Sequence, residues 1–104
     1  MLFYASTYAD LNQATKDKVI LLPLGAIEQH GPHLSVSTDT DIVTQIAQQI
    51  EKILPNEVLL CPTLPFGSSH HHLSFGGTIS IAPELYTQVL IDLVNSLVIS
   101  GFQK

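Results

Sequence analysis

Two short apolar runs separated by an amphipathic stretch limit the fold more than any other feature of this sequence. The runs occupy residues 19–22 and 58–61, and each is bounded by charged residues or proline. Continuous apolar runs of this length suit strands that are covered on both faces, as in a parallel sheet. Between them, residues 42–54 repeat apolar side chains at three- and four-residue steps, which is typical of an amphipathic helix. The pattern therefore predicts a βαβ unit.

Further helices are expected around this unit. The Thr-Asp-Thr-Asp sequence at residues 38–41 fits a capping-box pattern with Asp41 in the usual Glu position, so we expect it to start the central helix. Pro83 can open a second helix that ends near Gly101, and residues 7–14 can form a short one. Residues 63–80 show no period and predict a long loop. Together these elements predict a single α/β domain with the order βαβα.

The composition indicates a surface that is partly covered. Charged residues make up 12% of the 104 residues and hydrophobic residues 45%, whereas charged residues average about 25% in globular proteins. A small domain needs proportionally more polar surface. We therefore expect part of this chain to be covered, either by another part of the same protein or by a second copy in a homo-oligomer.

Charge and cysteine content exclude several classes of protein. Four Lys and Arg residues against nine Asp and Glu give a net charge of -5, so nucleic-acid binding and anionic membrane surfaces are not expected. No apolar run reaches the roughly 18 residues that span a bilayer, and the N-terminus lacks the features of a signal peptide. The single Cys61 cannot form an internal disulfide. These features favour a cytoplasmic protein.

Side chains that bind metals cluster just after the first apolar run. Glu28, His30, His33 and Asp39 share one turn-rich segment, and carboxylate with imidazole is a ligand set that zinc, manganese and iron accept. Glu28 and His30 are two residues apart, so they project to the same side of an extended backbone. Asp39 lies at a helix start and, as a carboxylate, can bridge two ions. A purely structural role stays open for Asp39 as a helix-start residue and for the histidines as loop residues.

The loop after the second run brings further candidates. Ligands of an open parallel sheet gather at the carboxyl ends of its strands, so residues 67–77 should lie beside residues 28–33. Of the consecutive His70, His71 and His72, at most two can serve one ion, and we expect one to face the site.

The same loop also offers hydroxyl groups. Ser68 and Ser69 could hydrogen-bond a substrate, although their spacing alone fits hydroxyls that meet water. Cys61 is expected to be a buried thiol, and no general base is placed in sequence to activate it.

The order of these motifs resembles the creatininase (creatinine amidohydrolase) family. Pro-Leu-Gly-Ala-Ile-Glu-Gln-His-Gly-Pro-His-Leu at residues 23–34, followed by Thr-Asp-Thr-Asp, is similar to its first block. Leu-Pro-Phe-Gly-Ser-Ser and His-Leu-Ser-Phe-Gly-Gly-Thr-Ile-Ser, within residues 64–80, resemble its second block in the same order and at similar separation. The family usually has proline where Gly76 or Gly77 stands. The resemblance runs from about residue 19 to the last residue.

This resemblance implies a three-layer α/β/α fold with a mainly parallel sheet, of which residues 1–104 would be the N-terminal βαβα part. It also implies a dinuclear metal hydrolase acting on C–N amide bonds of creatinine-like cyclic amides, formamides or peptide-like substrates. By matching position, Glu28 and His30 would each bind one divalent ion, zinc or alternatively manganese or iron, and Asp39 would bridge the two. His72 would lie on the substrate side, whereas His33 and Asp41 would not be primary ligands.

The resemblance also sets limits on this chain. Family members continue into a further strand and a loop that supplies more His and Glu ligands, so the domain is expected to be incomplete and the isolated chain inactive. An alternative from another class is a non-catalytic creatininase-like binding or assembly module that keeps the fold without the reaction. Metal analysis separates the two hypotheses.

Overall fold

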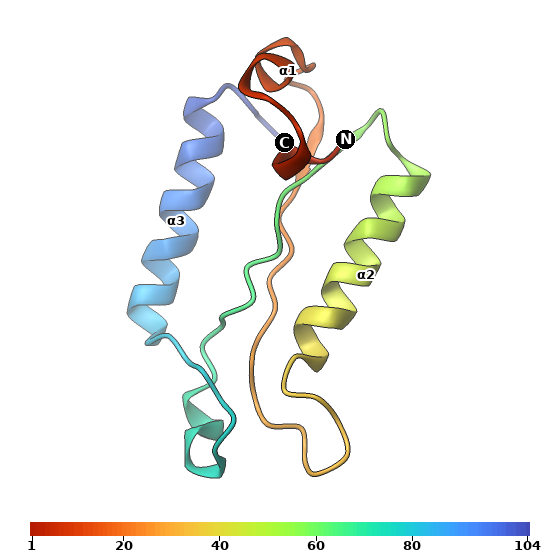
Figure 1. Ribbon diagram of the computed structural model, residues 1–104. Helices are drawn as coiled ribbons and strands as arrows, with labels where there is room; N and C mark the ends of the chain where they lie inside the picture. Colours follow the sequence, from red (N-terminus) through yellow and green to blue (C-terminus); the bar gives the residue numbers. More distant parts are fainter.

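The computed structural model describes residues 1–104 and shows two parallel strands flanked by helices (Figure 1). The predicted α/β class and its βαβα order are confirmed. Two short 3₁₀ helices, η1 and η2, accompany the strands and α-helices. In chain order the elements are η1 (Phe3–Ala5), α1 (Tyr8–Gln13), β1 (Val19–Leu21), α2 (Thr38–Ile53), β2 (Val58–Leu60), η2 (His70–Phe75) and α3 (Pro83–Ile99).

The strand pair forms the best-buried part of the molecule. β1 and β2 pair in parallel with Val19 opposite Val58, and every residue of β2 is buried. Both chain ends extend the pairing: Leu2 bridges to Leu60 in parallel, and the Ile20 N–H donates to the main-chain oxygen of Lys104 at 2.9 Å. The two termini therefore lie together at one end of the strands, and the loops that follow β1 and β2 lie at the other end (Figure 1).

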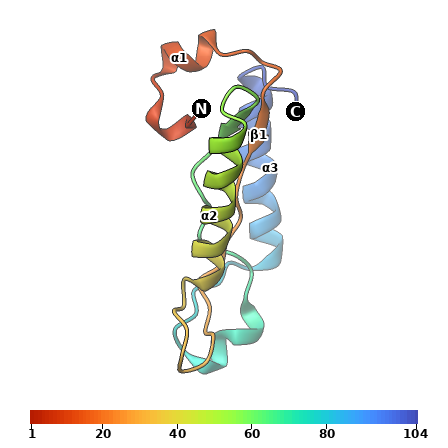
Figure 2. The ribbon, with the colours of Figure 1, turned by 90° about the vertical axis from the view of Figure 1, so that its right-hand side faces the viewer.

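Helices α2 and α3 lie on opposite sides of the strand pair (Figure 1). Seen from the side, the strands lie between the two helices (Figure 2). The molecule is long and flat as a result, with extents of 47 × 29 × 20 Å. This layered order is the α/β arrangement that the alternation of strands and helices predicts.

The start of α2 differs from the expected capping box. Ser37, not Thr38, is the N-cap residue, and its side chain makes no capping hydrogen bond to a backbone N–H. The Ser37 hydroxyl instead donates to the Asp41 carboxylate at 2.7 Å, and the Thr38 hydroxyl donates to the Ser35 carbonyl at 2.6 Å. The predicted Thr38–Asp41 capping box is wrong because Ser37, not Thr38, precedes the first helical residue. The Thr38 hydroxyl hydrogen-bonds the Ser35 carbonyl instead of a helix N–H.

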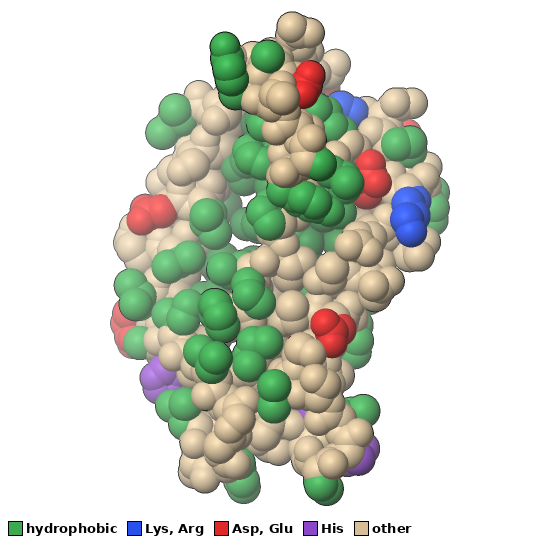
Figure 3. Space-filling model, viewed as in Figure 1, with side chains coloured by type: hydrophobic (Ala, Val, Ile, Leu, Met, Phe, Trp, Pro, Cys, Tyr) green, Lys and Arg blue, Asp and Glu red, His purple; other side chains and the backbone are tan.

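Much apolar surface stays exposed on the helices. Of the apolar stripe on α2 only Ala47 is buried, while Ile46 and Ile53 are 55% and 74% exposed. Hydrophobic side chains also gather over α3 and the adjoining strands in Figure 3. The charge-poor composition therefore corresponds to uncovered apolar helix faces in this chain. None of the helices has both the length and the hydropathy that a membrane span requires.

Candidate metal centre

The segments after β1 and β2 stay side by side beyond the regular strands. Leu24 bridges to Leu64 in parallel, and the Ile79 N–H donates to the Ile27 carbonyl at 2.9 Å. Residues 24–30 therefore lie between the start of α2 and the glycine-rich loop, at the carboxyl end of the strands (Figure 1). The predicted juxtaposition of these two loops is confirmed.

A close contact fixes the start of α2 against the first of these segments. A Cβ atom at Gly25 would lie 2.5 Å from the Thr40 Oγ1 and 2.8 Å from the Thr40 Cα, so only glycine fits there. The Thr40 hydroxyl donates to the Ala26 carbonyl at 2.8 Å. Since Thr40 follows Asp39 in the first turn of α2, this contact places the Asp39 carboxylate next to residues 28–30.

Glu28, His30 and Asp39 come together in space and are called the candidate metal centre below. One ligand-capable atom from each lies within 4.8 Å of the others, and all three residues are half-buried. The His30 Nε2 atom is 3.4 Å from the Asp39 Oδ1 atom. Zinc holds nitrogen and oxygen ligands at about 2.0–2.2 Å, so two ligands of one tetrahedral ion stand about 3.4 Å apart. The spacing and the chemistry of this ligand set both fit a divalent ion.

The protonation of His30 suits a metal ligand. Its Nδ1 atom lies 3.0 Å from the Glu28 carbonyl oxygen. Because a carbonyl oxygen can only accept, the proton of the neutral ring sits on Nδ1 and the Nε2 lone pair faces Asp39. This hydrogen bond, followed by the nearby Asp39 and Glu28 carboxylates, raises the pKa of His30 although partial burial opposes the shift. A histidine oriented in this way by its other nitrogen is the usual arrangement around protein-bound zinc.

The Glu28 carboxylate is held in its charged form. The pKa of Glu28 is lowered chiefly by the hydroxyl of Ser69, against an opposing effect of burial, with smaller contributions from Asp39, His72 and His30. Ser69 is only 2% exposed. Its hydroxyl therefore does not meet water, as its spacing alone suggested, and it is the main cause of the lowered pKa of Glu28. Ser68 is half-buried, and a substrate contact of either serine stays a prediction.

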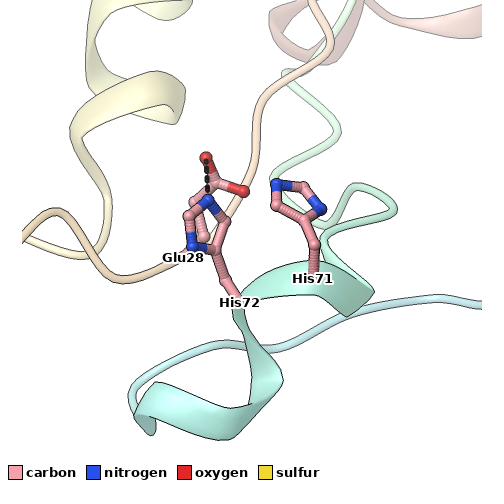
Figure 4. A group of neighbouring side chains, drawn as sticks. All are labelled: Glu28, His71 and His72. Carbon is pink, nitrogen blue, oxygen red and sulfur yellow. Dashed lines mark ion pairs between the residues drawn. The ribbon is translucent and has the colours of Figure 1, made fainter.

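The histidine run is not a featureless loop, because residues 70–75 form η2. Two of its histidines reach Glu28, where a single one was expected: ligand-capable atoms of Glu28, His71 and His72 lie within 4.8 Å of one another. Figure 4 shows the His72 ring directed at the Glu28 carboxylate, with 4.0 Å between Nε2 and Oε1. His70 turns away, with its Nδ1 atom 2.6 Å from the Ser80 hydroxyl.

Three residues of this region were missed or misjudged in the sequence. Ser69 and His71 are polar loop residues in the sequence, but no periodicity indicates how Ser69, just before η2, and His71, within η2, are oriented. Gln29 was not singled out, although its side chain lies 2.8 Å from His72. The only signal for Gln29 was its position between two candidate ligands. His33, which matches the motif, is exposed.

Comparison with known proteins agrees with this geometry. The sequence profile of the family described as "Creatininase: Creatinine amidohydrolase" matches residues 5–104. A mycofactocin precursor peptide peptidase from Mycobacterium tuberculosis (strain CDC 1551 / Oshkosh) is 41% identical over 81 residues, which cover 70% of this chain and 32% of that protein. The chain thus spans about a third of the length of that relative.

Solved creatininase structures superpose closely on the chain. A mutant creatininase described as "Zn-Zn type" matches with a TM-score of 0.86 and 25% identity, over 96% of this chain and 41% of that one. A mutant creatininase complexed with creatine matches with a TM-score of 0.86 and 26% identity, over 96% and 40%. Since the family profile matches nearly the whole sequence, the chain belongs to the creatininase family.

Proposed function

We propose that this chain carries part of the metal site of a metal-dependent amidohydrolase. The observation that carries the proposal is the candidate metal centre, in which the His30 Nε2 lone pair faces the Asp39 carboxylate at 3.4 Å, with Glu28 alongside. This centre lies at the carboxyl end of parallel strands, where ligands of α/β proteins gather. A related creatininase bears the description "Zn-Zn type", which supports two zinc ions as the cofactor, with manganese or iron as alternatives.

Each ligand has a proposed role. Glu28 and His30 would each hold one ion and Asp39 would be shared between them, as the resemblance to the family motif implies. A divalent ion at such a site polarises an amide carbonyl and lowers the pKa of water. Neighbouring groups also favour the forms that bind metal: the Ser69 hydroxyl lowers the pKa of Glu28, and the Glu28 carbonyl accepts from His30 Nδ1 and leaves Nε2 free.

The proposed substrates are small molecules or peptides with a hydrolysable amide C–N bond. Relatives include a protein complexed with creatine and a peptidase acting on a precursor peptide. His72, whose ring is half-buried beside Glu28, would face the substrate, together with Ser68 and Ser69. Because three protein ligands would under-coordinate two ions, we expect weak zinc binding and little hydrolysis by the 104-residue chain itself. A cytoplasmic homo-oligomer stays a prediction.

Zinc titration of the chain by calorimetry tests this proposal. The wild-type chain should bind zinc, whereas Glu28→Gln and Asp39→Asn should each lose that binding. Asp41→Asn is the matched control, because Asp41 is exposed, lies in the same helical turn and pairs with the Ser37 hydroxyl. Equal zinc binding by Asp39→Asn and the wild type would overturn the assignment, and rapid amide hydrolysis by the isolated chain would refute the expected inactivity.

The exposed apolar faces of α2 and α3 support a second candidate function. Ile46 on α2 is 55% exposed and Val98 on α3 is 59% exposed, as would suit a non-catalytic binding or assembly module. Such a module would bind no metal under any loading condition. Self-association of a metal-free chain, measured by analytical ultracentrifugation, would favour this candidate over the hydrolase.

A further inference from the structure

We propose that Gln29 is a positioning residue that keeps the proton of the neutral His72 ring on Nε2, so that His72 acts as a hydrogen-bond donor and not as a metal ligand. The inference starts from the second cluster of ligand-capable side chains, formed by Glu28, His71 and His72. Two histidines with one glutamate form a ligand set that zinc accepts. Whether this cluster can bind a metal depends on which nitrogen of His72 carries the proton.

A backbone hydrogen bond first fixes the orientation of the Gln29 amide. The Gly31 main-chain N–H donates to the Gln29 Oε1 atom at 3.0 Å. Turning the amide over would place its NH₂ group against this N–H, with two donors facing each other. The orientation of an amide is assigned from such contacts, and here the donor is unambiguous. The Gln29 NH₂ group must therefore face the other way.

The oriented amide then fixes His72. The Gln29 Nε2 atom lies 2.8 Å from the His72 Nδ1 atom. Since the NH₂ group can only donate, Nδ1 must accept, and a neutral imidazole then carries its proton on Nε2. The backbone of Gln29 is held as well, because its N–H donates to the Thr78 hydroxyl at 3.1 Å. Both side-chain hydrogen bonds of Gln29 therefore have a donor and an acceptor only when the amide oxygen faces Gly31 and the NH₂ group faces His72 Nδ1.

This arrangement is the reverse of that at His30. The His30 Nδ1 donates to a carbonyl oxygen and leaves the Nε2 lone pair free, whereas the His72 Nε2–H is directed at the Glu28 carboxylate (Figure 4). A metal ion needs a lone pair, so His72 is held in the form that cannot ligate through this atom. The two imidazoles close to Glu28 therefore differ in what they can do: His30 can ligate through Nε2, whereas His72 can donate from it.

The His72 Nε2–H also has room for another acceptor. Its distance of 4.0 Å from the Glu28 Oε1 atom exceeds that of a hydrogen bond. A carbonyl oxygen of a bound amide could accept from it next to the metal centre. This last step rests on the proposed function, whereas the proton position on His72 does not depend on metal binding or on activity.

Nitrogen-15 NMR of the metal-free chain tests the proton position directly, at about pH 8.5 where imidazoles are neutral. The His72 signals, identified by their loss in His72→Gln, should show a protonated Nε2 and an unprotonated Nδ1. The His30 signals should show the opposite pattern. A protonated Nδ1 on His72, or averaged signals from both tautomers, would overturn the proposal even if the chain binds zinc as proposed above.

The Gln29→Glu variant provides a second test. A carboxylate at this position can accept both from the Gly31 N–H and from His72 Nδ1–H, so the His72 proton should move to Nδ1 and free the Nε2 lone pair. We expect the variant to bind one more zinc ion per chain than the wild type, and Gln29→Glu/His71→Gln to lose that extra ion. Gln29→Met offers neither bond and leaves the ring free to adopt either tautomer, so its gain in zinc binding should be smaller than that of Gln29→Glu. Unchanged zinc stoichiometry in a folded Gln29→Glu chain would contradict the inference.

Discussion

Substitution of Gly25 by alanine tests the link between the fold and the candidate metal centre. The added methyl group would lie 2.5 Å from the Thr40 Oγ1 atom and 2.8 Å from the Thr40 Cα atom. Carbon atoms at optimal contact stand about 3.5–4.0 Å apart. The segment of residues 24–30 that follows β1 and the start of α2 would therefore have to separate by about 0.7 Å or more, because a backbone atom cannot rotate out of the way.

The expected cost follows from this displacement. Overpacking of a closely packed position costs about 1–3 kcal/mol, so Gly25→Ala should lower the free energy of unfolding by an amount in that range. The same displacement moves Asp39 away from His30 and should stretch the Thr40–Ala26 hydrogen bond. Because disturbance of groups that support metal ligands typically costs about 10–100-fold in metal affinity, zinc binding should weaken by at least that lower factor.

Urea unfolding and zinc calorimetry, run on the same preparations, measure both effects. Gly101→Ala is the control: Gly101 has a φ of +92°, so alanine is strained there, but the added methyl would make only ordinary contacts with Lys16, at 3.6 Å or more. The C-terminus, which follows Gly101 by three residues, lies at the other end of the strands from the loops that form the metal centre (Figure 1). Both variants should lose stability and only Gly25→Ala should lose zinc affinity. A Gly25→Ala chain with wild-type stability and zinc affinity would refute this reasoning.

Three further predictions concern the core, the thiol and the pH dependence. Leu59→Ala should lower the free energy of unfolding by about 2–5 kcal/mol, because Leu59 is 0% exposed; a loss well below that range in a urea titration would contradict the buried position. Cys61 should react with iodoacetamide far more slowly in the folded chain than in urea, since burial raises the pKa of its thiol; equal rates would show that the thiol is accessible. Zinc affinity should fall as the pH drops through the raised pKa of His30, because protons compete for Nε2, and it should begin to fall above the ordinary imidazole value of about 6.5. Calorimetry at several pH values checks this, and a flat profile would exclude His30 as a ligand.

The sequence predicted the framework because its periodicity changes clearly from one element to the next. The apolar runs became β1 and β2, and the three- and four-residue spacing became α2 and α3. The sequence predicted burial less well than secondary structure. Ile53 belongs to the apolar stripe of α2 and is nonetheless 74% exposed. A hydrophobic pattern identifies the face of a helix, but whether that face is covered depends on neighbours that periodicity does not describe.

The candidate metal centre could be predicted in part. Glu28, His30 and Asp39 were recognisable from residue type, position after a strand and motif, and the structure brings them together. The roles of Ser69 and Gln29 could not be found in this way. Ser69 acts from a buried position just before the 3₁₀ turn at residues 70–75, and Gln29 acts through hydrogen bonds to the Gly31 backbone and to His72. Such contacts leave no repeating pattern in a sequence.

Anomalous diffraction at the zinc absorption edge, from crystals of the chain grown with zinc, tests metal binding most directly. We expect an anomalous peak bounded by the carboxylates of Glu28 and Asp39 and by the Nε2 atom of His30, and no such peak in Asp39→Asn crystals grown in the same way. A peak found only between His71 and His72, or a peak that persists in Asp39→Asn, would contradict the assignment of the metal centre.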